Sequence, residues 1–380
     1  MSINRNNPKY ITSLSQISSL SPERRRELSV VAQKFAFRTN EYYQSLIDWN
    51  DPADPIRRIV MPEIEELDQF GAWDASHEAS YTVVKGLEHK YSDTGLLLVN
   101  NVCGAYCRFC FRKRLFTDDN DEVTNDIGPA LDYIRAHPEI NNVLLSGGDP
   151  LIMSTGKLEN IIQQVRRIDH VKVIRIGSKM PALNPLRIVN DPSLSEMLSK
   201  YSQVGRKIFV MAHFNHPREL TDVAVECIAM LQRAGLTVVN QTPIIRGVND
   251  DPTVLAELFN CLSFNGVPPY YVFICRPTAG NRGFVVPIEE ALAILDGARE
   301  NVSGLARQAR LCMSHKSGKI EVLGRTDSHV ILRYHRAANP ADTGKVLVLP
   351  SKPTACWFDD YFEHTPELEL GELAARSAAT

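Results

Sequence analysis

From residue 95 onward, short apolar runs alternate with stretches that place hydrophobic residues on one helical face. The runs predict strands at 95–100, 142–148, 172–178, 207–214, 237–242 and 270–275. The intervening stretches predict helices at 126–137, 157–168, 192–201, 221–234, 252–264 and 287–299. Apolar strands that alternate with helices are typical of an α/β fold with a helix-covered parallel sheet. Six such units favour a partial (β/α)6 TIM-like barrel, with an open doubly wound sheet as the alternative.

The two ends of the chain follow different patterns. Residues 1–90 are rich in charge and predict a helical N-terminal region ahead of a barrel core at 91–304. Residues 305–380 predict a small C-terminal α/β extension. Within it, "KIEVLGRTDSHVILRYHRA" reads as two strands joined by a polar turn at Arg325 to Ser328.

Composition narrows the class of protein. The 380 residues are 44% hydrophobic with a formal net charge of -3, which suits a soluble globular protein with a sizeable core. This balance gives no electrostatic reason to expect nucleic acid or an anionic membrane as a partner. No apolar run is long enough to span a bilayer, and "MSINRNNPKY" lacks the apolar centre of a secretory signal. We therefore expect a cytoplasmic protein.

Three of the eight cysteines are clustered, and the cluster directly follows the first predicted strand. Cys103, Cys107 and Cys110 lie in "NVCGAYCRFCFRKR" with the spacing C-x3-C-x2-C. The other five are single cysteines among apolar residues, as expected of buried core thiols. Polar residues also follow the later strands, for example "SGGDPL" and "HFNHP". Because the carboxyl ends of parallel strands share one edge, these residues predict a single site.

Three thiolates from one loop suit a [4Fe-4S] cluster in which one iron stays open for an outside ligand. Zinc is the alternative, with His213 as a candidate fourth ligand. However, structural zinc usually takes two ligand pairs, and catalytic zinc favours His and carboxylate ligands. A purely structural thiol cluster is disfavoured because exposed loop thiols oxidise readily.

The surrounding residues resemble the radical S-adenosylmethionine (radical SAM) superfamily and, within it, a divergent member of the lysine 2,3-aminomutase family. "CGAYCRFCFRKR", "LLSGGDPL", "IRIGS", "HFNHP" and "NQTPIIRGVND" carry this resemblance, which extends over about residues 60–335. It implies that Cys103, Cys107 and Cys110 hold the cluster and that Arg112 binds the substrate carboxylate. It also implies a set of SAM-binding residues, namely Gly147, Gly148, Asp149, His213, Asn215, His216 and Gln241.

The resemblance further implies pyridoxal phosphate (PLP), attached to a lysine near the C-terminus. Lys319 aligns best with that lysine and Lys316 second best. Two arginines that hold the PLP phosphate in the family are replaced here by Lys90 and Thr94. Lys90 can still meet a phosphate as a point charge, although both guanidinium forks are missing.

The substrate side departs from the family pattern as well. Lysine-specific members place an acidic residue after the cysteine of the sixth strand, and Arg276 stands there instead. An arginine inverts the charge preference, so lysine is a poor candidate substrate. A small molecule with a distal anionic or neutral polar group fits better.

These residues predict an isomerase that generates a 5'-deoxyadenosyl radical and carries out a PLP-assisted 2,3-amino shift on an amino acid other than lysine. One alternative is a PLP-independent radical rearrangement, elimination or oxidation. Another is an iron–sulfur or zinc protein with a structural or sensing role. The resemblance also implies an electron donor such as flavodoxin or ferredoxin, and it leaves open whether the chain forms a homo-oligomer.

Overall fold

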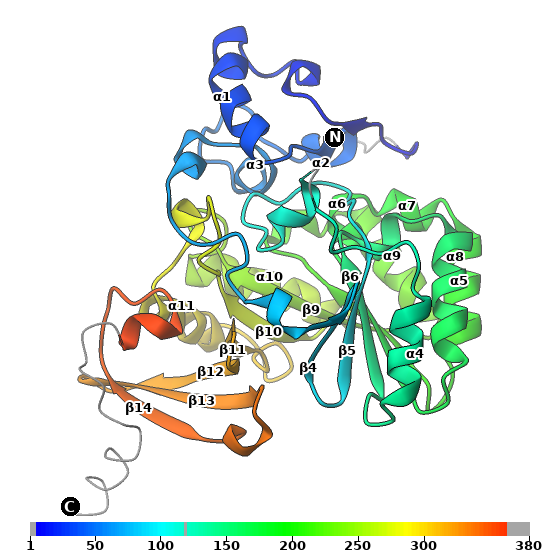
Figure 1. Cartoon of the computed structure of the whole chain (residues 1–380). Helices are drawn as coiled ribbons and strands as arrows, with labels where there is room; N and C mark the ends of the chain where they lie inside the picture. Colours follow the sequence, from blue (N-terminus) through cyan, green and yellow to red (C-terminus); the bar gives the residue numbers. More distant parts are fainter. Residues whose placement is uncertain (1–4, 118–119, 363–380) are drawn as a thin grey trace, which may run out of the picture.

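The computed structural model describes residues 5–117 and 120–362, and the core of this structure is one long sheet (Figure 1). Twelve strands lie in the order β14-β13-β12-β11-β10-β9-β8-β7-β6-β5-β4-β3. Seven consecutive strands are parallel to one another: β5 (Thr94–Asn100), β6 (Asn142–Gly147), β7 (Val173–Ser178), β8 (Ile208–Ala212), β9 (Thr237–Ile244), β10 (Pro269–Ile274) and β11 (Arg310–His315).

The six expected strands are β5 to β10. The seventh parallel strand, β11, lies in the segment where we expected only the C-terminal extension. It pairs with β10 through Tyr271 and Arg310, and through Phe273 and Cys312. It therefore continues the core sheet past residue 304. The fold is a partial TIM-like barrel whose sheet is extended at both edges by antiparallel strands.

Helices cover the outer face of the parallel strands (Figure 1). The helices that follow β5 to β10 are α4 (Gly128–Ala136), α5 (Thr155–Arg166), α6 (Met180–Leu183), α7 (Leu186–Val189), α8 (Pro192–Tyr201), α9 (Asp222–Arg233), α10 (Pro252–Phe264) and α11 (Ile288–Glu300). Helix α8 begins as the sequence indicates, because the Asp191 side chain accepts a hydrogen bond from the Leu194 backbone and Pro192 occupies the first turn.

Each strand turns alternate residues to opposite faces of the sheet. On β7, Ile174 and Ile176 are fully buried in the core beneath the helices. The residues that alternate with them, Arg175 and Gly177, line the inner cavity. Strand β6 follows the same rule, with Leu144 and Ser146 facing inward. Strands β6 and β7 therefore line the barrel interior with one residue in two, and this set includes polar side chains.

The N-terminal region packs against the cysteine-bearing end of the barrel. It contains α1 (Pro22–Lys34), α2 (Glu41–Gln44) and α3 (Pro55–Val60), and the short strands β1 (Tyr10–Ile11) and β2 (Thr39–Asn40). Two antiparallel strands, β3 (Thr82–Val84) and β4 (Leu87–Tyr91), then join the edge of the main sheet at β5. Buried residues of this region, among them Leu28 and Tyr43, share a core with Phe109 of the cysteine loop.

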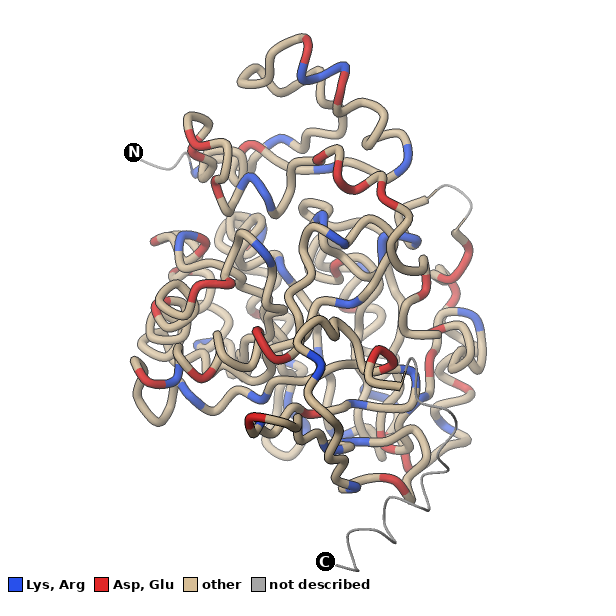
Figure 2. The backbone as a smooth tube through the Cα atoms, turned by 90° about the vertical axis from the view of Figure 1, so that its left-hand side faces the viewer, with Lys and Arg blue, Asp and Glu red and all other residues tan. Residues whose placement is uncertain are grey.

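The described part of the C-terminal extension consists of β12 (Gly318–Arg325), β13 (His329–Ala337) and β14 (Val346–Pro350), with short 3-10 turns. The turn expected at Arg325 to Ser328 joins β12 and β13. Residues 363–380 of the expected extension lie outside the described residues. No helix in the described residues is long and apolar enough to cross a membrane. Basic and acidic residues are interspersed along the chain (Figure 2).

Candidate active site

The cysteine loop follows β5 and is held by the N-terminal region. Arg38 donates a hydrogen bond from Nε to the carbonyl of Cys103 (2.8 Å). Asn40 donates from Nδ2 to the carbonyl of Gly104 (3.0 Å) and to that of Leu183 (2.9 Å). These hydrogen bonds fix the start of the cysteine loop against the N-terminal region and against Leu183.

The glycines after β6 allow this loop to approach closely. Gly147 has a φ of 112°, a conformation that favours glycine. A Cβ added to Gly148 would lie 2.5 Å from the backbone nitrogen of Val102 and 2.7 Å from its carbonyl carbon. The Asp149 backbone N–H donates to the Val102 carbonyl (2.8 Å). Both glycines are therefore needed where β6 meets the start of the cysteine loop.

The Asp149 carboxylate serves to connect two strand ends. It accepts hydrogen bonds from the Ser178 hydroxyl (2.8 Å) and from three backbone N–H groups, those of Leu151, Lys179 and Met180. Burial raises the pKa of Asp149 to about 6, although these donors favour its ionised form. Its oxygens therefore fix the loops after β6 and β7.

A cavity of about 350 Å³ opens inside the barrel at the carboxyl ends of the strands. The three cysteines line it together with Gly147, Gly148, Asp149, His213 and Gln241. Lys90, Arg112, Arg276 and Lys319 line the same cavity. Asn215 and His216 do not belong to its lining. Asn215 donates from its side chain to the Thr242 hydroxyl (2.6 Å), and His216 caps a turn through the Arg218 backbone (3.2 Å).

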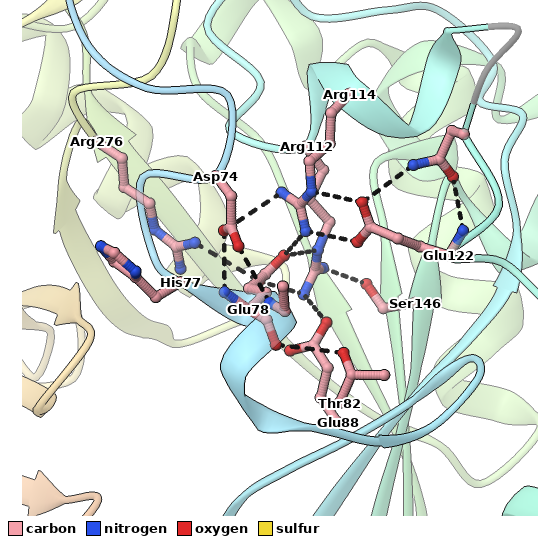
Figure 3. A network of polar contacts seen from close by, with 12 residues as sticks. Asp74, His77, Glu78, Thr82, Glu88, Arg112, Arg114, Glu122, Ser146 and Arg276 are labelled. Carbon is pink, nitrogen blue, oxygen red and sulfur yellow. Dashed lines mark hydrogen bonds and ion pairs between the residues drawn. The ribbon is translucent and has the colours of Figure 1, made fainter.

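A network of buried charges forms one wall of the cavity (Figure 3). Arg112 donates from Nε (3.0 Å) and Nη2 (2.8 Å) to the two oxygens of Glu78, and from Nη1 to the Ser146 hydroxyl (2.9 Å). Arg114 also donates to Glu78 (2.6 Å), and Nη1 of Arg276 lies 3.7 Å from it. Although burial opposes ionisation, these three cations lower the pKa of Glu78 to about 2.

Lys319 and Lys316 have very different surroundings. The Nζ of Lys319 lies 3.9 Å from the ring centroid of Tyr271, inside the cavity, and no carboxylate of the described residues forms an ion pair with it. Burial and nearby cations, Arg175 among them, lower the pKa of Lys319 to about 7. Lys316 is half exposed, lies 3.8 Å from the Asp359 carboxylate and does not line the cavity.

Comparison with known proteins agrees with this geometry. The family model of the radical SAM superfamily matches residues 97–259. A protein of Aquifex aeolicus named "Putative L-lysine 2,3-aminomutase" is 56% identical over 94% of this chain and 96% of its own length. The L-lysine 2,3-aminomutase of Clostridium subterminale is 38% identical over 79% of this chain and 71% of its own.

The glutamate 2,3-aminomutase of Clostridioides difficile is 32% identical over 81% of this chain and 72% of its own. A radical SAM methyltransferase structure from Sphaerobacter thermophilus is 16% identical, covers 60% of this chain and 68% of its own, and has a TM-score of 0.42. This chain belongs to the lysine 2,3-aminomutase family of the radical SAM superfamily. It is thus an aminomutase-like radical SAM enzyme that uses a [4Fe-4S] cluster and SAM.

The cysteines of this aminomutase-family enzyme fit a cluster. All three are free thiols that line the cavity. Burial raises the pKa of Cys107 to about 12 and also raises that of Cys110, so the positive charge of iron is needed to hold them as thiolates. In the described residues, no three His, Cys, Asp or Glu side chains surround one point as a single zinc ion would require. Cluster cysteines each bind a different iron.

Five charged residues of the cavity were missed in the sequence, and one of them is Lys179, which lines the cavity just after β7. Arg175 lies inside the barrel on β7, where its Nε donates a hydrogen bond to the neutral Asn142 side chain (2.9 Å). Arg336 reaches the same cavity from β13. Glu78 and Glu88 line it from the segment before β5. An arginine within the apolar run "KVIRIGS" was a usable signal, since charged residues are rarely buried without a role. Arg336 lies in the strand pair that the sequence does predict, but a linear pattern does not show which way its side chain points. Glu78 and Glu88 lie in the N-terminal region, where no motif marks them.

Proposed function

We propose that this enzyme catalyses a PLP-assisted 2,3-amino shift on an amino acid other than lysine. The observation that carries the proposal is the position of Lys319, whose amine shares one cavity with the three cysteines. A lysine that attaches PLP must be deprotonated, and burial favours the neutral amine. When bound, the cluster and SAM supply a hydrogen-abstracting radical, and PLP carries the migrating nitrogen.

The cavity also has groups that suit the PLP phosphate. Lys90, Arg175 and Arg336 line it together with Lys319. Lys90 donates to the carbonyl of His315, and burial lowers its pKa to about 8. The Arg336 guanidinium lies 4.3 Å from the Tyr91 ring centroid and pairs with Asp93. Two guanidinium groups from other strands would thus take over from the two missing arginines. Thr94 donates its hydroxyl to Asp93 (2.6 Å).

The remaining predicted site residues bind the substrate and SAM and hold them in position. Of the five N–H groups of Arg112, two are occupied by Glu78 and one by Ser146. Arg112 therefore meets a substrate carboxylate with its remaining Nη hydrogens and keeps its own place through Glu78. His213 and Gln241 line the cavity at the ends of β8 and β9, where the proposal assigns them to SAM. Asn215 and His216 support this wall from outside the cavity.

The experiment that tests the proposal is reductive trapping. Protein loaded anaerobically with PLP is treated with borohydride and digested, and the modified peptide is mapped. We expect the label on Lys319, its absence in Lys319→Ala, and normal labelling in the matched control Lys316→Ala. Labelling of Lys316, or none with PLP in excess, would contradict the proposal and favour the PLP-independent alternative.

A second variant tests the phosphate groups. Replacing Arg336 with Leu removes one guanidinium from the cavity, and losing a charge-assisted hydrogen bond should weaken PLP affinity about tenfold. The matched control is Arg333→Leu on the same strand, because Arg333 pairs with Glu321 (2.5 Å) and does not line the cavity. Equal PLP affinity of Arg336→Leu and the wild type would remove Arg336 from the proposed site.

A further inference from the structure

Glu88 is a buried acidic residue to which the proposed function gives no role. It lies on β4, is only 7% exposed and lines the cavity. Its Oε1 is buried and has no hydrogen-bond partner within the described part of the chain. Its nearest cation is Nη2 of Arg112 at 3.8 Å, which is too long for a hydrogen bond. Buried carboxyl oxygens normally have partners, so this oxygen points to a missing one.

Arg276 has the corresponding feature on the other side of the Glu78–Arg112 pair (Figure 3). Its Nη1 is buried and also lacks a hydrogen-bond partner in the described residues, with Glu78 at 3.7 Å. The guanidinium carbon lies 3.6 Å from the ring centroid of Phe111, which fixes its orientation. The cavity wall therefore presents two groups that are free to hydrogen-bond a ligand, the Arg276 guanidinium and the Glu88 carboxyl group.

The charges around Glu88 decide which ligand suits this pair. The charged groups that face it are Glu78, Arg112, Arg114 and Arg276, with Lys90 two residues along the same strand. Burial, reinforced by the negative charge of Glu78, raises the pKa of Glu88 to about 8. At neutral pH this carboxyl therefore holds its proton and is able to donate a hydrogen bond. With Glu88 neutral, the four cations Arg112, Arg114, Arg276 and Lys90 face the three carboxylates of Glu78, Asp74 and Glu122, which leaves one cation in excess at this wall.

We propose that Glu88 and Arg276 recognise the far end of the substrate and that this end is a carboxylate. The carboxylate accepts hydrogen bonds from Nη1 of Arg276 and from the protonated carboxyl of Glu88. This inference rests on the proposed amino shift and narrows its substrate to an acidic amino acid. A distal ammonium would face Arg276 and be repelled. A distal carboxamide would satisfy the hydrogen bonds but would leave the cationic excess unbalanced.

Binding without turnover tests this assignment. Enzyme carrying cluster, PLP and SAM, but no reductant, is titrated calorimetrically with L-glutamate, L-aspartate, L-glutamine and L-lysine. We expect the better acidic ligand to bind at least about tenfold more tightly than L-glutamine or L-lysine at pH 7. The ratio of glutamine Kd to glutamate Kd isolates the distal group, because the α-groups of the two ligands are the same.

The pH dependence identifies Glu88. Above the pKa of Glu88, the preference for glutamate over glutamine should fall, by about tenfold from pH 8 to pH 9, because a proton must accompany the carboxylate. Glu88→Gln keeps a donor at this place, so its preference should persist and no longer change with pH. Arg276→Gln should lose the preference at every pH. Thermal unfolding of each variant checks that it folds.

The outcomes separate this inference from the proposed function. A wild-type preference for glutamine or lysine, an acid preference that does not fall above pH 8, or a fall with pH that persists in Glu88→Gln, overturns the role of Glu88. If the expected discrimination appears but the reduced enzyme forms no β-amino acid from any acidic ligand, the amino shift falls and the recognition site stands.

Discussion

The carboxylate of Glu78 and the guanidinium of Arg112 form a two-point hydrogen bond, at 3.0 and 2.8 Å, on the wall of the cavity. Glu78 lies in a 3-10 turn ahead of β3, whereas Arg112 lies just past the cysteine loop. The contact therefore ties the edge of the sheet to the segment that holds the cluster ligands. Any movement of Arg112 toward a substrate has to work against this pair.

Removing the Glu78 charge should destabilise the protein. Glu78→Gln leaves the buried cations Arg112, Arg114 and Arg276 without their shared carboxylate. The free energy of unfolding at pH 7 should therefore fall by about 3 kcal/mol. The pKa of Glu78 is lowered to about 2, so its contribution is present above its unfolded pKa of about 4.5 and is lost as the pH falls toward 2. Chemical denaturation at pH 7 and at pH 2.5 measures both effects. Glu65→Gln, which removes an exposed partner of Arg58, should change little.

A methyl group at Gly148 should displace the cysteine loop. The added Cβ would contact the Val102 backbone, which cannot yield as a flexible side chain would. We expect Gly148→Ala to reduce the iron content after anaerobic reconstitution to less than about half that of the wild type. Gly156→Ala is the matched control, because Gly156 is in helix α5 with no atom within 4 Å of the added Cβ. Full iron loading of Gly148→Ala would show that the loop tolerates this approach.

Loss of one cluster cysteine should abolish SAM cleavage. Cys107→Ala leaves two thiols in the loop, too few to retain a four-iron cluster that already has one open iron. Iron analysis and 5'-deoxyadenosine formation by the reduced protein are the measurements. Cys261→Ala, on helix α10 outside the cavity, should match the wild type in both. Stoichiometric zinc in place of iron after anaerobic reconstitution would contradict the cluster.

The attachment of PLP should depend on pH through Lys319. Because its pKa is lowered to about 7, the neutral amine is a minority at pH 6 and dominates at pH 8. The attachment rate should rise about tenfold over this range and then level off. Rapid-mixing absorbance measurements on anaerobic protein report the rate. A rate that continues to rise up to pH 10 would mean that Lys319 keeps the pKa of an exposed lysine.

The sequence by itself determined the parallel strands β5 to β10, the helices α4, α5, α8, α9, α10 and α11, and the cysteine loop. These features are local: apolar periodicity defines a strand or helix, and C-x3-C-x2-C places three ligands within eight residues. Strand β11 was not predicted as part of the parallel sheet, because its apolar run is short and shows no clear periodicity. Only its pairing with β10 makes it the seventh parallel strand. The change of chain direction at β12 is a local hairpin, in which His315 pairs with Gly318.

The composition of the cavity was decided by the tertiary structure. Arg175 and Arg336 are far apart in sequence and reach one cavity because alternate residues of β7 and β13 face inward. Glu78 meets Arg112, and Glu88 comes to lie 3.8 Å from the same guanidinium, only once β4 pairs with β5. Asn215 and His216 belong to a sequence motif but lie outside the cavity lining, where Asn215 bonds Thr242 of β9 and His216 bonds the Arg218 backbone. Side-chain direction depends on strand pairing around a curved sheet, and a linear pattern does not contain that information.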